Sequence, residues 1–115
     1  MIDPLQFFKC LADETRLKCL ILLVVEDELC VCEFMEALQE IQPKISRHLA
    51  LLREHRLVVD RRQAQLIYYR LNPNLPQWAR SVLAETAQSN QSFIKTNLSK
   101  LGCMDARPQR AQAFC

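Results

Sequence analysis

Apolar residues recur at helical spacing in three segments before residue 40. The first segment begins at Pro4, a residue that favours the first turn of a helix, with Asp3 before it as a cap. The second follows another cap, Asp13, and continues through Leu17–Val24 until an acidic run interrupts it. The third has apolar residues at i, i+3, i+4 and i+7, namely Val31, Phe34, Met35 and Leu38. These patterns predict three successive helices.

A fourth helix and a hairpin are predicted next. Proline is tolerated in the first turn of a helix and disfavoured later, so we expect a helix to begin near Pro43. Its apolar face consists of Ile45, Leu49 and Leu52. Two β-branched and aromatic runs, 57–59 and 66–71, flank the polar stretch 60–65, which is typical of a β-hairpin. Because this stretch has no glycine, we expect a loose loop rather than a tight turn.

The last predicted element is one long helix that Pro76 opens and Gly102 ends. Four helices, a hairpin and a final helix make a winged helix-turn-helix. The predicted fold class is therefore mainly α, with five helices and a two-stranded β-hairpin wing. We expect residues 1–102 to form one DNA-binding and dimerisation domain, and residues 103–115 to form a flexible tail.

Composition agrees with a small helical domain. The chain has 115 residues, half of them hydrophobic and only one of them glycine. Its first residues lack the basic segment of a signal peptide, and its longest apolar run, Leu20–Val25, is too short to span a bilayer. We therefore expect a cytoplasmic protein, in which the six cysteines are thiols rather than disulfides.

Charge is distributed unevenly along the chain, although the formal net charge is only +2. Residues 1–41 carry nine acidic and three basic residues, whereas residues 42–62 carry six basic and two acidic ones. Such segregation indicates a local surface for a polyanion. On charge alone, an ordinary solvated surface is an equally good interpretation.

The start of the fourth helix carries the side chains suited to reading DNA. In a helix-turn-helix, the N-terminal residues of the second helix contact base edges in the major groove. The candidate DNA-binding residues are Gln42, Lys44, Ser46, Arg47 and His48 on this helix, with Arg61, Arg62 and Gln63 at the hairpin. The alternative is an amphipathic helix with a solvated face, and His48 alone is as well explained by a structural hydrogen bond.

Cys30 and Cys32 form the main chemical feature of the sequence. Thiolates are preferred ligands of soft ions, although two small buried hydrophobic residues would give the same pattern. Residues two apart on a regular helix point to roughly opposite sides, so the two thiols can share an ion only at a distorted helix start. We hypothesise that ion binding deforms this start and weakens DNA binding.

The other cysteines carry less information. Cys10 and Cys19 fall on or near apolar faces, where free cysteine is usually a core residue. Cys103 and Cys115 lie in or near the tail, where they are either incidental or supply an additional ligand.

Several stretches together resemble the ArsR family of metalloregulatory repressors. They are LADETRL (11–17), ELCVCE (28–33), QPKISRHLALLR (42–53), DRRQ (60–63) and YRL (69–71). The resemblance implies a winged-helix homodimer that pairs through its first and last helices and binds an inverted-repeat operator. It also implies release when As(III) or Sb(III) binds Cys30 and Cys32, with no cofactor required for DNA binding. Residues 43–53 would be the recognition helix, and residues 60–71 the wing.

The sequence departs from the family pattern at two positions. Met35 stands where a third cysteine often follows the pair, and a thioether is a poor ligand for trivalent arsenic. The site then has two protein thiols plus a small thiol, recruits Cys10, Cys19, Cys103 or Cys115, or is weakened. Ala64 stands where a glycine is common, which affects the turn of the wing.

Other functions fit the same fold. Cys30 and Cys32 would also suit a redox switch, although Glu28 and Glu33 beside them favour protonated thiols. A cadmium, lead or zinc sensor is another alternative, but the last helix has no histidine and only Glu85 as an acidic residue. A winged-helix interaction module with inert cysteines belongs to a different class. An enzyme is not expected.

Large apolar residues on the terminal helices favour a dimer. These are Phe7, Phe8, Trp78, Phe93 and Ile94.

Overall fold

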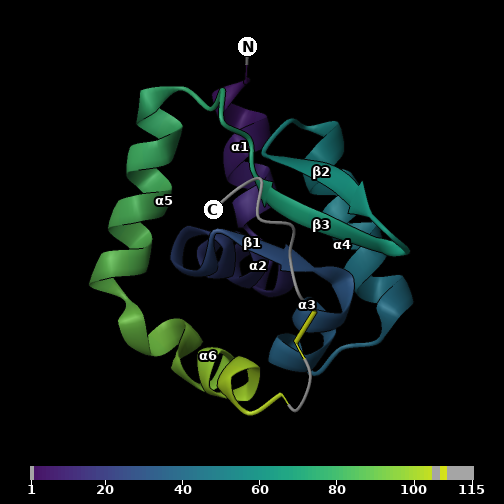
Figure 1. The fold of residues 1–115 in the computed structure, drawn as a ribbon. Helices are drawn as coiled ribbons and strands as arrows, with labels where there is room; N and C mark the ends of the chain where they lie inside the picture. The colour runs from purple at the N-terminus through teal and green to yellow at the C-terminus, as the bar shows by residue number, and fades with distance from the viewer. Residues whose placement is uncertain (1, 105–106, 109–115) are drawn as a thin grey trace.

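The computed structural model describes residues 2–104 and 107–108. Helices build most of this structure, and a small antiparallel sheet lies at one side of them (Figure 1). The elements in chain order are α1 (Pro4–Leu11), α2 (Glu14–Glu26), β1 (Glu28–Cys30), α3 (Val31–Leu38), α4 (Gln42–Glu54), β2 (Val58–Gln63), β3 (Leu66–Leu71), α5 (Gln77–Ser89), a 3-10 turn η1 (Gln91–Ile94) and α6 (Lys95–Gly102). This order confirms the predicted winged helix-turn-helix, with α3 and α4 as the two helices of the motif.

The first helices begin where their caps predict. The Asp3 carboxylate accepts a hydrogen bond from the backbone N–H of Gln6 at 3.1 Å, and Pro4 opens α1. The Asp13 carboxylate accepts one from the backbone N–H of Arg16 at 3.0 Å, at the start of α2. Each cap satisfies a donor that the first turn of a helix leaves without a partner.

The sheet has three strands in the order β1-β3-β2: β2 and β3 are the predicted two-stranded hairpin, and β1 is a third strand that was not predicted. β1 pairs antiparallel with β3, and Cys30 lies opposite Tyr68. β2 pairs with the other edge of β3, and Arg61 lies opposite the same tyrosine. A three-residue strand is too short to show an alternating pattern in sequence, so its pairing with β3 is what reveals it.

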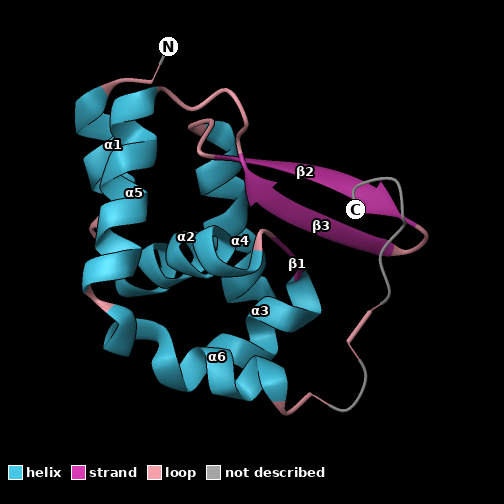
Figure 2. Cartoon of the chain, turned by 60° about the vertical axis from the view of Figure 1, so that its left-hand side comes forward, coloured by secondary structure: helices cyan, strands magenta, loops and turns pink. Residues whose placement is uncertain are grey.

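The hairpin of β2 and β3, which we call the wing, projects away from the helices in Figure 2. Gln63 pairs with Leu66, so only Ala64 and Gln65 form the turn. The prediction of a loose loop was therefore wrong. Ala64 adopts a φ of 56°, in the left-handed region that glycine normally occupies. Alanine accepts this conformation at an energetic cost, so the absence of glycine did not lengthen the turn.

The final helix is broken, which corrects the prediction of one helix from Pro76 to Gly102 and gives six α-helices in the described part of the chain. The polar run 89–92 occupies the break, and the Asn90 side chain donates to the backbone carbonyl of Thr86 at 3.0 Å. Asparagine side chains compete with helix hydrogen bonds in this way. After the break, α6 packs against α3, where Asn97 donates to the carbonyl of Ala37 at 2.8 Å.

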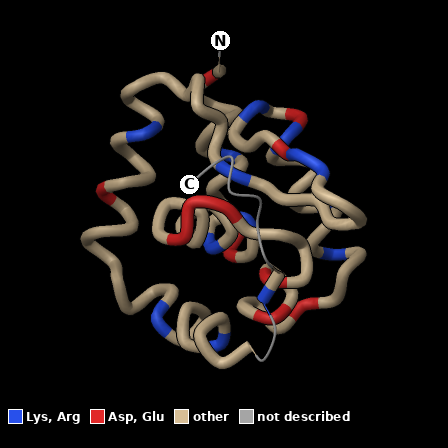
Figure 3. Tube along the Cα trace, viewed as in Figure 1, with Lys and Arg blue, Asp and Glu red and all other residues tan. Residues whose placement is uncertain are grey.

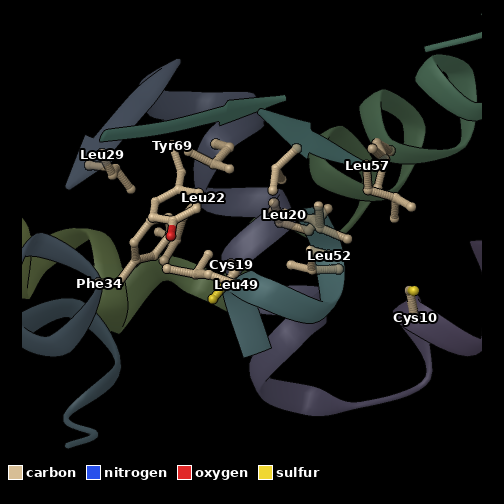
Figure 4. Packing of buried hydrophobic residues seen from close by; sticks show 14 of the residues in the cluster. Cys10, Cys19, Leu20, Leu22, Leu29, Phe34, Leu49, Leu52, Leu57 and Tyr69 are labelled. Atoms are coloured by element: carbon tan, nitrogen blue, oxygen red, sulfur yellow. The ribbon is translucent and has the colours of Figure 1, made fainter. Parts of the chain in front are cut away.

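The core surrounds α2, whose residues 19–23 are buried on every side (Figure 4). Residues from α3, α4 and the sheet pack against this helix, including Phe34, Leu49, Leu52 and Tyr69. Cys10 and Cys19 are buried among these apolar side chains, as predicted for core cysteines. The core therefore ties α3, α4 and the sheet to one central helix.

The expected tail lies mostly beyond the described residues, since residues 105–106 and 109–115, including Cys115, are outside them. Within residues 2–104 and 107–108, no helix is long and apolar enough to cross a membrane.

Candidate thiol site and nucleic-acid interface

Cys30 and Cys32, the thiol pair, meet at the junction of β1 and α3. Cys30 ends the strand and caps the helix with an extended backbone, whereas Cys32 lies in the first turn. Their sulfur atoms are 2.7 Å apart, and both are free thiols. The change from extended to helical backbone brings the two thiols to one side, so an undistorted α3 already presents them together.

A buried carboxylate, that of Glu33, lies beside the thiol pair. Glu33 is fully buried, and its Oε1 accepts the backbone N–H of Cys30 at 2.9 Å. Its Oε2 accepts a hydrogen bond from Arg107 Nε at 2.6 Å, and the same guanidinium reaches Glu26 at 3.1 Å. An N-cap residue followed three positions later by glutamate is a capping-box pattern, so C-x-x-E was the signal in sequence for Glu33. Sequence reasoning gave no signal for Arg107.

This environment keeps Cys30 protonated. Burial raises the pKa of its thiol to about 12, and the hydrogen bond with Cys32 and the charge of Glu33 act in the same direction. Cys32 is only half-buried, so it is the member of the pair that solvent reaches more readily. The site therefore presents one buried, protonated thiol and one more accessible thiol.

The thiol pair supplies two ligands for a soft ion. Among residues 2–104 and 107–108, no three cysteine, histidine or acidic side chains are placed to hold one metal ion. Of the suggested additional ligands, Cys10 and Cys19 are in the core, and Cys103 is exposed beyond the end of α6. Among the described residues, Cys30 and Cys32 are therefore the two candidate ligands for a soft ion.

The helix α4 presents the first part of the predicted DNA surface. Ile45, Leu49 and Leu52 are buried, as their spacing predicted. Gln42 and Arg47 are exposed, and Ser46 is half-buried. Lys44 is also half-buried and forms an ion pair with Glu40 at 2.9 Å. These four side chains lie on or beside the solvent-facing side of the helix, where a DNA groove can reach them.

His48 faces the protein instead. Its Nδ1 accepts a hydrogen bond from Arg16 at 3.3 Å, its Nε2 lies 3.9 Å from Asp13, and only 12% of its side chain is exposed. Burial lowers the pKa of His48, and the neighbouring Arg16 lowers it further, against the raising effect of Asp13. This placement favours the structural interpretation of His48, because it joins α4 to the start of α2.

The three wing residues predicted to bind DNA, Arg61, Arg62 and Gln63, have different surroundings in the structure. Arg62 is exposed, and Gln63 accepts a hydrogen bond from Arg61 Nη1 at 2.8 Å. Arg61 turns toward the sheet, where it forms two hydrogen bonds with Glu28 and lies over the ring of Tyr68. Sequence reasoning missed Glu28 and Tyr68, since only the register of the three strands brings them to Arg61. In Figure 3, acidic positions gather where α2 passes into β1, and basic positions lie along the hairpin and at the end of α4.

An aromatic surface covers α1 and the start of α5, which lie side by side in Figure 2. The rings of Phe7, Phe8 and Trp78 contact one another, with centroids 5.0 to 6.3 Å apart. Phe7 is buried, whereas Phe8 and Trp78 remain 49% and 39% exposed and Leu5 remains 62% exposed. Exposed apolar residues gathered in this way are a candidate surface for contact with another protein.

Comparison with known proteins identifies the family. Residues 13–59 match the model described as bacterial regulatory protein, arsR family. The chain is 50% identical, over all 115 residues and the whole relative, to the arsenic resistance transcriptional regulator ArsR2 of Pseudomonas putida KT2440. It is 48% identical over 103 residues to the arsenical resistance operon repressor of Escherichia coli K12, covering 87% of this chain and 88% of the relative.

Solved structures agree with this assignment. HlyU from Vibrio cholerae N16961 superposes with a TM-score of 0.66 and 30% identity, over 74% of this chain and 88% of that one. The transcriptional repressor BigR from Xylella fastidiosa gives a TM-score of 0.63 and 29% identity, over 74% and 83%. Relatives that match along the whole chain, together with the matched helix-turn-helix and the observed winged fold, establish that this chain belongs to the ArsR family of bacterial transcriptional regulators.

Proposed function

We propose that this protein represses an arsenic-resistance operon and leaves its operator when As(III) or Sb(III) binds Cys30 and Cys32. The observation that carries the proposal is the 2.7 Å separation of these two thiols at the first turn of α3. This helix is the first of the helix-turn-helix and packs against α4. A change in conformation at the thiols would therefore occur next to α4, the helix proposed to contact DNA.

The chemistry of the thiol pair suits arsenite. Each thiol displaces one hydroxyl group of arsenous acid, and the thiol proton leaves with that group as water. An arsenic–sulfur bond replaces an arsenic–oxygen bond, with no oxidation or reduction. Because each thiol brings its own proton, the raised pKa of Cys30 does not prevent the exchange. A hydroxyl group or a small cellular thiol fills the third position of the pyramid.

Capture of the ion would change the start of α3. A bound ion would replace the contact between the two thiols with two sulfur–ion bonds, each about 2.3 Å long for a metal such as zinc, and so would change the geometry of Cys30 and Cys32. Cys30 is both the last residue of β1 and the N-cap of α3, so the adjustment reaches the end of the strand as well as the first turn of the helix. This displacement biases the helix pair toward a form that binds DNA less tightly.

The proposed DNA surface consists of Gln42, Lys44, Ser46 and Arg47 on α4, together with Arg62 and Gln63 on the wing. We further propose that two copies of the chain pair through the aromatic surface of α1 and α5. A two-fold dimer would place two α4 helices on the half-sites of an inverted repeat. A repressor of chromosomal or plasmid genes would act in the cytoplasm.

A thiol-redox switch is the second candidate, and the closeness of the two sulfurs favours it. Disulfide formation requires an oxidant, however, and the relatives of this chain are named for arsenic resistance rather than for a redox response. Arsenite is therefore the favoured effector.

The test uses a labelled inverted-repeat duplex that has been selected in vitro with the same protein. Binding of the reduced protein to this duplex is measured by fluorescence anisotropy at fixed salt. Salt is held constant because phosphate contacts make the affinity steeply salt-dependent. Arsenite is expected to release the wild type but not the Cys30→Ser, Cys32→Ser double variant. If oxidant releases the wild type and arsenite does not, the redox alternative replaces the proposal. If both proteins bind DNA and neither responds, the thiol pair is not a switch.

A further inference from the structure

We infer that the ion pair of Glu28 and Arg61 connects the thiol pair to the wing, so that inducer binding acts on the wing as well as on α3. Both are positioning residues in this inference, which rests on the proposed function. The predicted role of Arg61 was a direct DNA contact, and its observed contacts suggest this different role.

The sheet places Cys30 and Arg61 in one row of paired residues. Cys30 lies opposite Tyr68, and Tyr68 lies opposite Arg61 on its other side, so one row crosses all three strands. Glu28 lies two residues before Cys30 on β1, and alternate residues of a strand share a face. The row therefore starts at the strand that carries the buried thiol and ends in the wing.

The Arg61 guanidinium connects the two outer strands of the sheet. Its Nε and Nη2 donate to the two carboxylate oxygens of Glu28 at 2.7 and 2.8 Å, and its guanidinium carbon lies 4.6 Å from the centre of the Tyr68 ring. Two parallel hydrogen bonds fix the relative orientation of both groups. The Arg61 side chain thus spans the sheet from β2 to β1.

Burial makes this pair sensitive to movement. Glu28 is only 6% exposed, so a displaced carboxylate would lose its partner without gaining full hydration. The pair of Arg53 and Asp60, at 2.7 Å, also joins the wing to a neighbouring element, but it is more exposed and does not contact β1. It provides a matched control on the same strand as Arg61.

The proposed link operates as a two-state element. In the DNA-binding state, the Glu28–Arg61 pair holds the wing against β1. Inducer capture moves the backbone at Cys30, displaces Glu28 two residues away and breaks the two-point contact. The wing then loses the support that orients Arg62 toward DNA.

The test compares Glu28→Gln, Arg61→Gln and the double variant with Asp60→Asn. For each protein, the DNA dissociation constant is measured with and without saturating arsenite, and the ratio is the coupling. Coupling between two sites is typically about 5-fold to 150-fold. We expect Glu28→Gln and Arg61→Gln to weaken DNA binding without arsenite and to reduce the ratio at least threefold. The double variant should lose no more than either single variant, and Asp60→Asn should keep the wild-type ratio.

Glu28→Gln is the decisive variant, because a buried carboxylate does not contact phosphate. If Arg61 only contacts DNA, Arg61→Gln will weaken binding equally with and without arsenite, and Glu28→Gln will keep the wild-type ratio. That pattern would overturn the inference.

A readout without DNA separates this inference from the proposed function. The NMR signal of the Arg61 Nε–H group, assigned with Arg61→Lys, is followed while arsenite binds the DNA-free protein. We expect a shift in the wild type and in Asp60→Asn, and none in the Cys30→Ser, Cys32→Ser variant. Arsenite binding without a shift in the wild type would contradict the link. A shift without release from DNA would contradict the proposed function but support the link.

Discussion

At the scale of single residues, backbone and burial decide the chemistry of the thiol pair. The extended N-cap of α3 turns Cys30 toward Cys32, and the surrounding core keeps Cys30 from solvent. The same two residue types in an exposed helix would point apart and titrate independently. The local fold therefore gives two ordinary thiols different accessibilities while holding their sulfurs together.

Alkylation at pH 7.5 should reveal this difference. We expect iodoacetamide to modify Cys32 and Cys103 at least about tenfold faster than Cys30 and Cys19, because one unit of raised pKa removes about nine-tenths of the reactive thiolate. Burial raises the pKa values of Cys19 and Cys30 to about 12 and also closes their approach. Peptide mass spectrometry would measure each rate, with urea-unfolded protein as the control. Equal rates for Cys30 and Cys103 in the folded protein would contradict the described site.

Ala64 should be a position where glycine stabilises the fold. A left-handed conformation costs an L-residue roughly 1–2 kcal/mol, and the extra freedom of unfolded glycine offsets about 0.4–1 kcal/mol of any gain. We expect Ala64→Gly to raise the free energy of unfolding by about 0.5–1 kcal/mol in urea denaturation. The neighbouring Gln65 has no positive φ, so Gln65→Gly should lower it. An equal effect at both positions would show that the strain at Ala64 is absent.

At the scale of elements, local signals predicted most of the fold. Helix starts depend on hydrogen bonds and steric effects between neighbouring residues, so they could be predicted from the sequence at Asp3, Asp13 and Pro43. β1 and the break at Asn90 were missed, because the strand depends on β3 and the break interrupts an otherwise apolar helical pattern. The residues of the candidate site divide in the same way, into those set by near neighbours and those set by distant segments. The thiol pair was visible as C-x-C, whereas the partners of Arg61 and His48 come from distant segments.

The two faces of α4 should respond differently to mutation. Arg47 is exposed on the proposed DNA side, and one lost phosphate contact lowers the slope of log affinity against log salt by about 0.9. We expect Arg47→Gln to lower the slope by about 0.9 per protomer, measured by anisotropy at several salt concentrations. His48→Asn should leave the slope unchanged, since His48 contacts Arg16 and Asp13 instead. A reduced slope for His48→Asn would show that His48 contacts DNA.

His48 should also make stability depend on pH. Its folded pKa lies below the unfolded value of about 6.5, so the unfolded chain binds the proton more readily as the pH falls through that value. The contribution is complete above pH 6.5 and is lost progressively below it. We expect the wild type to lose more stability than His48→Asn between pH 7.5 and pH 5.5 in urea denaturation. An identical loss in both proteins would mean that His48 is readily protonated in the folded state.

At the scale of the whole molecule, function in this account requires two surfaces at once. We propose that the aromatic surface of α1 and α5 contacts a second copy and that α4 and the wing contact DNA. The thiol pair lies between the first helix of the motif and the sheet that carries the wing, so one event there can reach both elements proposed to contact DNA. The sheet thus links the inducer site to the wing, as the core links it to α4.

The aromatic surface should hold the dimer together. We expect Phe8→Glu to give a folded monomer in sedimentation velocity, because it places a charge within the exposed apolar surface. Circular dichroism would check that the helices remain. Ile41 is 68% exposed at the start of α4, outside this surface, so Ile41→Glu serves as the control and should leave the dimer intact. A dimeric Phe8→Glu protein would place the interface elsewhere.

The proposed coupling between the thiol pair and DNA is tested by the affinity of arsenite for the reduced protein, measured with and without saturating selected DNA at the same salt. Linkage requires that if arsenite weakens DNA binding by some factor, DNA weakens arsenite binding by the same factor. We expect arsenite to bind less tightly to the DNA-bound protein, by the same factor as the weakening of DNA binding measured by anisotropy, and we expect no such difference in the Cys30→Ser, Cys32→Ser variant. Equal arsenite affinities for free and DNA-bound protein would contradict the proposed coupling, because the thiol pair would then have no thermodynamic connection to DNA binding.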